Sequence, residues 1–139
     1  MAPLLDSALP RPMLTRSEPQ LFVTDLESAC DFFTRTLGFT IGFVYGDPPY
    51  YAQVIRDGAR INLRHVDSPV IDPKRRERES LLSASITLET ADELKSLFEE
   101  FRAAGVDFAQ PLHREPWGAS TFTVRDPDGN LLLFASPSA

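Results

Sequence analysis

The sequence contains only one cysteine, Cys30, which excludes a disulfide within the chain and favours a reducing compartment, the cytoplasm. Cys30 falls on the apolar face of a predicted helix, a position that favours an inert buried thiol over a nucleophile. No apolar run approaches the roughly 20 residues that a membrane-spanning helix requires, so no membrane partner is expected. The first twenty residues contain four prolines and no apolar segment, which predicts a loose tail and not a signal peptide.

A basic surface is also missing. The 14 Lys and Arg residues against 20 Asp and Glu residues give a formal net charge of −6. Nucleic-acid binding requires a basic face, so no nucleic-acid partner is expected, whereas an acidic surface suits a cationic small molecule. The one basic run, residues 74–78, is interrupted by Glu77, and the preferred interpretation is a solvated loop or short helix.

The residues that are present form two copies of one pattern. In the first copy the alternating segment Glu18–Val23 precedes a helical stripe from Leu26 to Leu37, which Thr24 or Asp25 can cap and Gly38 ends. Three further predicted strands follow, and an Asp57-Gly58 hairpin turn precedes the last of them: residues 39–45, 50–56 and 59–65.

The second copy begins with the alternating segment 83–88. Thr90 and Glu93 then form a capping box for a helical stripe over residues 94–104, which Gly105 ends. After a strand around Phe108, a hairpin spans residues 115–134 and turns at residues 126–129, where Pro127 fixes φ and Gly129 can take φ > 0. The matching order and glycine positions indicate an internal repeat.

This repeat predicts an α+β fold of two tandem βαβββ modules that form a cupped mixed sheet, with one helix on one face of each module. We expect an N-terminal tail over residues 1–16 and a single domain over residues 17–137. Within the domain we place module one at residues 17–66, a linker at residues 67–80 and module two at residues 81–137.

Alternation within the strands predicts which side chains face the inside of the cup, because the apolar residues of one parity should pack on a helix. The repeat adds Leu133, which lies four residues past Gly129 as Asn62 lies four past Gly58. The predicted lining is polar and mixed: Glu18, Gln20, Phe22, Arg60, Asn62, Arg64, Ser83, Ser85, Thr87, Leu131 and Leu133. It indicates either a ligand site, or a cup in which Glu18 pairs with an arginine and water fills the rest.

Three motifs carry a family resemblance: LFVTDLESACDFFTRTLGF at residues 21–39, RDG-x-x-I-x-L at residues 56–63 and RDPDGNLLLF at residues 125–134. On these motifs the sequence resembles the vicinal oxygen chelate superfamily, which includes glyoxalase I, extradiol dioxygenases, fosfomycin-resistance enzymes and bleomycin-resistance proteins. The resemblance spans about residues 18–136. It implies paired βαβββ modules of the glyoxalase/bleomycin-resistance type and, often, a dimer. The motifs identify the fold but do not specify the function.

Metal-dependent members of this superfamily carry one ligand at each of four positions, which correspond here to Glu18, Asn62, Ser83 and Leu133. A divalent metal site requires at least three His, Asp or Glu donors on converging strands, and only Glu18 qualifies. His65 should point away from the cup, and His113 lies in a predicted loop. The resemblance therefore implies no metal and no other cofactor, and it disfavours a metal-dependent glyoxalase or dioxygenase.

Among metal-free members, the sequence most resembles the bleomycin-resistance proteins, which bind and sequester a drug without chemistry. In such proteins two chains typically build crevices at their interface, where aromatic residues stack on planar ligands and acidic residues attract cations. By this resemblance Trp117 is the stacking residue, with further contacts from Phe43, Tyr45, Tyr51 and Glu115. The alternative role for Trp117 is to anchor its own loop.

The first hypothesis is therefore a homodimeric binding protein, of the kind that confers antibiotic resistance, that sequesters an aromatic, partly cationic small molecule. Its candidate ligand-binding residues are Trp117, Asn62, Arg64, Arg60, Phe43, Tyr45, Tyr51, Ser83, Ser85, Glu115 and Leu133. The alternative is an enzyme of the same fold, an isomerase, lyase or glyoxalase-related protein, with Glu18 as base. In that hypothesis Arg60 or Arg64 holds a substrate carboxylate and Asn62 an oxygen. The fold does not decide between the two hypotheses.

Overall fold

The structure is a computed structural model, and it describes residues 10–137. Both modules have the predicted order of one strand, one helix and three strands. The elements of module one are β1 (Gln20–Val23), α1 (Leu26–Asp31), the π-helical turn η1 (Phe32–Thr36), β2 (Thr40–Tyr45), β3 (Tyr51–Arg56) and β4 (Ala59–His65). Helix α2 (Pro73–Glu79) connects them to module two, which contains β5 (Leu82–Thr87), α3 (Ala91–Ala103), β6 (Asp107–Arg114), β7 (Ser120–Arg125) and β8 (Leu131–Ser136).

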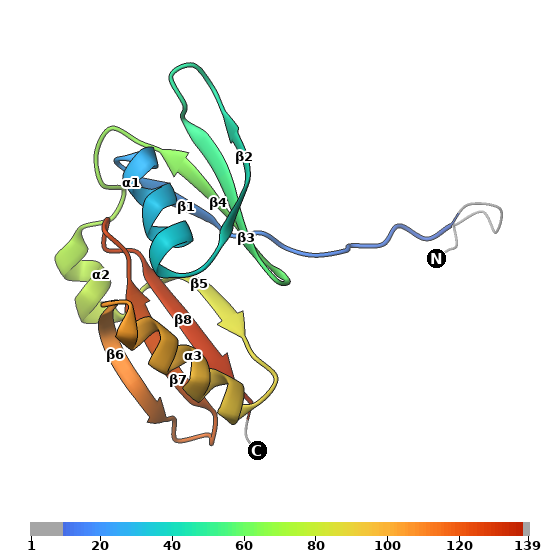
Figure 1. The fold of residues 1–139 in the computed structure, drawn as a ribbon, viewed down its shortest axis with the longest axis vertical. Coiled ribbons are helices and arrows are strands. Elements are labelled where there is room, and N and C mark those ends of the chain that lie inside the picture. The colour runs from blue at the N-terminus through green and yellow to red at the C-terminus, as the bar shows by residue number, and fades with distance from the viewer. Residues whose placement is uncertain (1–9, 138–139) are drawn as a thin grey trace, which may run out of the picture.

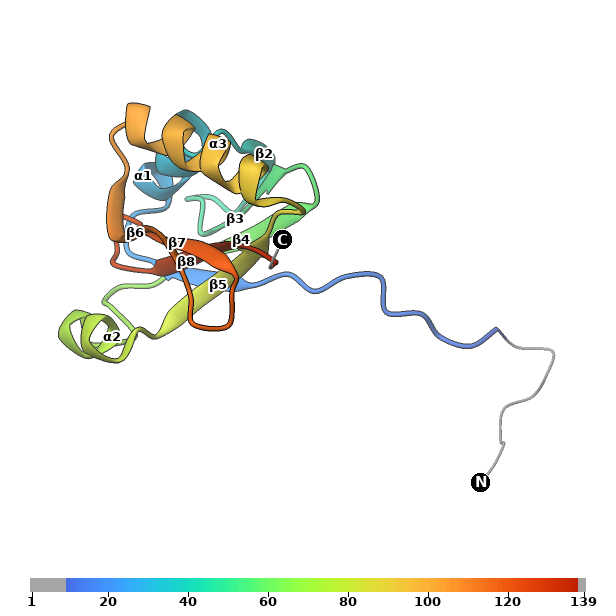
Figure 2. The same ribbon diagram turned by 90° about the horizontal axis from the view of Figure 1, so that it is seen from below.

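Each module forms one four-stranded mixed sheet, with the strand orders β1-β4-β3-β2 and β5-β8-β7-β6. The pairs β1–β4 and β5–β8 are parallel, and the other pairs are antiparallel. The two sheets lie one above the other in Figure 1. Figure 2 shows α1 and α3 on one side of the sheets and α2 on the other. We call the side opposite α1 and α3 the open face. The predicted α+β fold of two tandem modules is confirmed.

Short polar side chains and glycines set the helix boundaries. Of the two expected caps for α1, Asp25 acts as the N-cap, and its carboxylate accepts a hydrogen bond of 3.0 Å from the backbone N–H of Ser28. Thr90 caps α3, with its hydroxyl oxygen 3.1 Å from the backbone nitrogen of Glu93. Gly38 and Gly105 follow the two helices with φ of 76° and 80°, a conformation that favours glycine.

The core lies between each sheet and its helix, as the alternation predicts. Leu21 and Val23 of β1 are fully buried, and so are Ile61 and Leu63 of β4. In module two, Phe101 of α3 makes edge-on contacts with two strand residues, at ring-centroid distances of 5.9 Å to Phe122 and 5.3 Å to Phe134. Because the apolar positions of the strands are used here, the polar positions are left for the open face.

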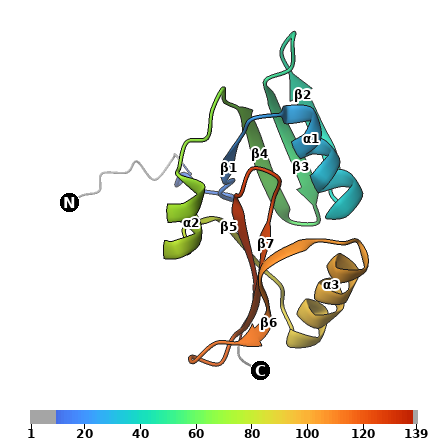
Figure 3. The same cartoon turned by 90° about the vertical axis from the view of Figure 1, so that its left-hand side faces the viewer.

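The β7–β8 turn joins the two modules. Figure 3 shows this turn beside β1, although the two are about a hundred residues apart in the sequence. Asp128 in the turn accepts hydrogen bonds from the backbone N–H and the hydroxyl of Thr24, at 2.9 and 2.7 Å. The buried Asn130 donates to the carbonyl of Phe22 at 3.1 Å. A second link is the pair of hydrogen bonds, 2.7 and 3.1 Å long, that Arg56 of β3 donates to Glu100 of α3.

Of two connecting regions, one agrees with an interpretation of the sequence and one differs from it. The predicted linker contains α2, which Asp72 caps through the N–H of Lys74 at 3.0 Å; this agrees with the short-helix alternative for the basic run. The prediction that His113 lies in a loop is wrong, because β6 continues to Arg114 through two irregularities in its pairing with β7. The strand includes Pro111, which an edge strand tolerates when the missing N–H faces away from its partner.

The predicted tail is described only in part, since residues 1–9 lie outside the described residues. Residues 10–16 are exposed and belong to no helix or strand, and in Figure 1 this segment runs away from the two sheets. The domain and module boundaries stay a prediction. Within residues 10–137, none of the helices has the length and apolar character that crossing a membrane would require.

Candidate functional site

Aromatic side chains cover much of the open face of module one. The antiparallel register places Phe43 opposite Gln53 and Tyr45 opposite Tyr51, so these side chains share one face of the sheet. The rings of Phe43 and Tyr51 are 5.8 Å apart, and Tyr45 is 64% exposed. Phe22 of β1 is also exposed on this face. Phe43, Tyr45 and Tyr51 are thus three predicted contact residues that the fold gathers on one surface.

A polar network lies beside these rings. Gln53 donates hydrogen bonds to Glu18 at 3.0 Å and to Asn62 at 2.9 Å, and Asn62 lies 3.5 Å from the same Glu18 oxygen. The Glu18 carboxylate also pairs with Arg16 at 2.6 Å. The hydrogen bond from Arg16 is the main reason that the pKa of Glu18 is lowered, because it stabilises the charged carboxylate.

One of the two alternatives drawn from the sequence pairs Glu18 with an arginine of the predicted lining, which contains Arg60 and Arg64. The partner is Arg16, from the segment that precedes β1. The sequence analysis also missed Gln53, although the Asp57-Gly58 turn fixes the β3–β4 register and pairs Gln53 with Asn62. Arg64 lies on the open face as predicted, in register with Tyr51 and Phe22, and is exposed.

The predicted residues of β5 and β8 form a separate group in module two. The Ser83 hydroxyl accepts a hydrogen bond of 2.7 Å from Arg76 of α2 and donates one of 3.0 Å to Asn130. Leu133 of β8 is half-buried and lies in register with Ser85 of β5. Ser83 and Ser85 both lie on β5, and the Ser83 hydroxyl is occupied by Arg76 of α2 and by Asn130.

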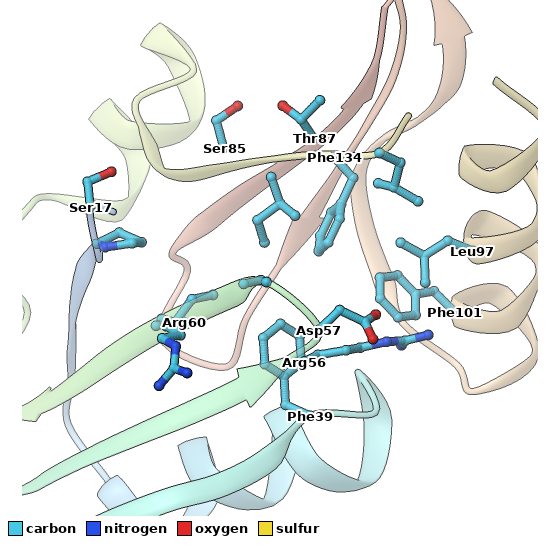
Figure 4. Close-up of a pocket in the computed structure, with 16 residues that line it drawn as sticks. Ser17, Phe39, Arg56, Asp57, Arg60, Ser85, Thr87, Leu97, Phe101 and Phe134 are labelled. Carbon is cyan, nitrogen blue, oxygen red and sulfur yellow. The ribbon is translucent and has the colours of Figure 1, made fainter. Parts of the chain in front are cut away.

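A cavity of about 460 Å³ lies between the two modules. Figure 4 shows Arg56 and Arg60 of module one on one side of this cavity and Leu97 and Phe101 of α3 on another. Ser85 also belongs to its lining. Two predicted site residues, Arg60 and Ser85, thus come together at the junction of the modules, at a volume in the range of small-molecule pockets.

Trp117 lies on a tight loop between β6 and β7. The loop is closed by hydrogen bonds from Glu115 N–H to the carbonyl of Ala119, 2.7 Å, and from Gly118 N–H to the carbonyl of Glu115, 2.8 Å. The indole is 70% exposed. The Glu115 carboxylate lies 2.7 Å from the His113 imidazole, whose other nitrogen lies 2.9 Å from the Pro111 carbonyl. The Pro111 carbonyl, and then Glu115, raise the pKa of His113.

One chain does not bring all the predicted residues together. Figures 1 and 3 place the β2–β3 hairpin and the β6–β7 loop at opposite ends of the molecule. The hairpin that carries Phe43, Tyr45 and Tyr51 therefore lies at the end of the molecule far from the loop that carries Trp117 and Glu115. The candidate site consists of two half-sites, an aromatic and polar surface on module one and an exposed tryptophan on module two.

The four positions that would ligate a metal do not fit one. Glu18 is held by Arg16, and Ser83 accepts a hydrogen bond from a guanidinium group, which a cation would have to displace. Asn62 offers a weak neutral ligand, and Leu133 has no donor atom. Across residues 10–137, no group of three or more His, Cys, Asp or Glu side chains is arranged to hold a metal ion.

Comparisons with known proteins agree with this fold. Similar solved structures include a glyoxalase/bleomycin resistance protein/dioxygenase from Alicyclobacillus acidocaldarius, at 21% identity and a TM-score of 0.70, covering 86% of this chain and 89% of that one. The bleomycin-binding protein of bleomycin-producing Streptomyces verticillus, complexed with copper(II)-bleomycin, is 24% identical, with a TM-score of 0.66 and coverages of 92% and 100%. Lactoylglutathione lyase from Agrobacterium tumefaciens is 18% identical, with a TM-score of 0.68 and coverages of 91% and 96%.

At these identities, the likeness to solved structures shows a shared fold alone. Among curated proteins, none matches this sequence. A family model does match, over residues 15–134, which is most of the chain. The chain belongs to the Glyoxalase/Bleomycin resistance protein/Dioxygenase superfamily.

Proposed function

We propose that this protein binds a small molecule without a metal and sequesters an aromatic, partly cationic ligand in a crevice between two copies of the chain. The observation that carries the proposal is a pair of aromatic half-sites: the exposed Phe43 and Tyr45 with the half-buried Tyr51 on module one, and the exposed Trp117 on module two. Aromatic rings of this size stack on planar ligands, and the acidic chain favours a positive charge.

The need for two copies follows from the distance between the half-sites. A second chain could place its Trp117 over the aromatic surface of the first, and twofold symmetry would then create two equal crevices. Burial of the exposed rings of the β2–β3 hairpin under a partner would also stabilise a dimer.

The environment of Glu18 disfavours the enzyme alternative. A general base must be free to accept a proton, and its pKa should lie near the working pH. Glu18 is instead paired with Arg16 and hydrogen-bonded to Gln53, and its pKa is lowered. A carboxylate held in this way is better suited to keep Arg16 and Gln53 in place than to transfer a proton.

A fluorescence titration tests the proposal. Bleomycin is a suitable first probe because the similar Streptomyces verticillus protein is complexed with its copper form. We expect saturable quenching of Trp117, the only tryptophan, by metal-free bleomycin or another planar cation, together with a dimer in sedimentation velocity. The absence of quenching across a panel of planar cations would contradict the proposal.

Two variants give this titration a matched comparison. Trp117→Ala should weaken binding, measured by calorimetry, while Leu14→Ala should not, because Leu14 is 97% exposed in the segment that runs away from the two sheets. Equal affinities of the two variants would exclude Trp117 as a stacking residue.

A further inference from the structure

A groove of about 800 Å³ lies on the helix-bearing side of module one, away from the open face. It runs between α1 and the β2–β3 hairpin. Its apolar part is formed by Ile41, Val44 and Tyr50, and all three side chains are exposed; Val44 reaches 50%. These residues leave an apolar surface in contact with water at a concave place, where a ligand with an apolar body would be stabilised.

The charges around the groove have one sign. Four carboxylates line it, from Asp25, Glu27, Asp31 and Asp47, and no lysine or arginine does. Arg35 approaches Asp31 from outside at 3.9 Å, an exposed and weak pair. His65 also lines the groove, with its ring 3.4 Å from Asp67. The groove therefore combines an apolar floor with a strongly negative rim.

The spacing of the carboxylates favours an organic cation over a metal ion. Asp25 and Asp31 are six residues apart, which on a helix corresponds to roughly 9 Å along the axis. A divalent ion requires donors that converge within about 2.6 Å of one point. Within residues 10–137, no set of three or more acidic, His or Cys side chains meets that requirement. A field spread over the rim instead attracts a cation whose position is fixed by apolar contacts.

We propose that this groove is a second binding site, which takes an organic cation, an amine or quaternary ammonium, that carries an aromatic or alkyl body. The apolar body rests on Ile41 and Val44, the ring of Tyr50 offers a cation–π contact, and Glu27 and Asp47 supply the charge. The site does not depend on Trp117 or on pairing of two chains, so it goes beyond the proposed function.

Cys30 provides a local reporter, because it lines the groove and is the only cysteine of the chain. Burial raises the pKa of its thiol, so alkylation is slow but specific to this place. The rate of modification by N-ethylmaleimide, followed by intact-protein mass spectrometry at pH 8, then measures access to the groove alone. The full-length protein is used throughout.

The probe is 1-naphthylmethylammonium, compared with the neutral 1-naphthylmethanol and the anionic 1-naphthaleneacetate. We expect the cation to slow alkylation at least threefold with saturation, the neutral analogue to do so only at higher concentration, and the anion to have no effect. The double variant Glu27→Gln/Asp47→Asn should weaken protection by the cation about tenfold. At a high dielectric constant, one carboxylate about 6 Å from a bound cation raises the affinity for that cation roughly threefold.

The matched control is Glu89→Gln/Glu99→Gln, which removes two exposed carboxylates that do not line the groove. It should leave protection of Cys30 unchanged, and Trp117→Ala should do the same. Equal protection by the three naphthyl probes, equal loss in both double variants, or no protection at all would overturn the proposal. Slow alkylation of Cys30 in the absence of a probe that becomes faster on dilution would also overturn the proposal, because a second copy of the chain would then cover the groove.

Discussion

Substitution of Asn130 by alanine should be among the most damaging changes outside the apolar core. The side chain is 5% exposed and makes three hydrogen bonds: to the Phe22 carbonyl at 3.1 Å, to the Asp126 carboxylate at 2.9 Å, and from the Ser83 hydroxyl at 3.0 Å. It thus connects module one, β5 and the β7–β8 turn. Counting about 1 kcal/mol for each neutral bond and about 2 kcal/mol for the charged one, Asn130→Ala should lose about 4 kcal/mol of unfolding free energy.

Urea denaturation at pH 7 followed by far-UV circular dichroism measures this loss; the fluorescence of the exposed Trp117 is a poor report on unfolding. Ser83→Ala is the matched comparison, because it removes the neutral bond to Asn130 and the bond of 2.7 Å from Arg76, which keeps its bond of 2.8 Å to the Leu81 carbonyl. We expect about 2 kcal/mol for that variant. If Asn130→Ala costs no more than Ser83→Ala, the turn does not hold the modules together.

Three further predictions concern titratable groups. Burial raises the pKa of Asp126 from 3.8 to about 6, against the opposing effect of its N–H donors. The folded protein therefore favours the protonated carboxyl, and this contribution to the unfolding free energy is complete below pH 3.8. It is lost as the pH rises through 6, by roughly 3 kcal/mol. Asp126→Asn should flatten that part of the pH profile of the urea midpoint, and an unchanged slope would refute the assignment. NMR titration should give His113 a pKa above 6.5, and Glu115→Gln should lower it; a pKa that does not respond would remove Glu115 as a partner. Arg16→Ala should raise the pKa of Glu18 toward 4.5 in the same experiment, whereas no change would mean that Arg16 does not hold the carboxylate in solution.

Most of the fold could be predicted from the sequence, because local signals and the repeat agree. The Asp57-Gly58 turn defined β4 as Ala59–His65, with the same bounds in the structure. Thr90 and Glu93 located the start of α3, and Gly38 and Gly105 the ends of the helices. Alternation then assigned the buried and open positions of β1 and β4.

The site was less predictable, because it depends on contacts between distant segments. Arg16 lies in a segment without any periodic pattern, so no signal linked it to Glu18. The bonds of Asn130 to Phe22 and of Asp128 to Thr24 cross more than a hundred residues. The separation of Trp117 from Phe43 followed only from the relative placement of the modules, which alternation within strands does not determine.

The most direct test of the account follows the fate of a bound ligand. Purified protein is titrated with metal-free bleomycin while Trp117 fluorescence is recorded, and the ligand is then released and examined by mass spectrometry. We predict saturable quenching at one ligand for each chain and recovery of chemically unchanged ligand. Quenching that is absent, or a released compound of altered mass, would contradict the claim that this protein sequesters its ligand without chemistry.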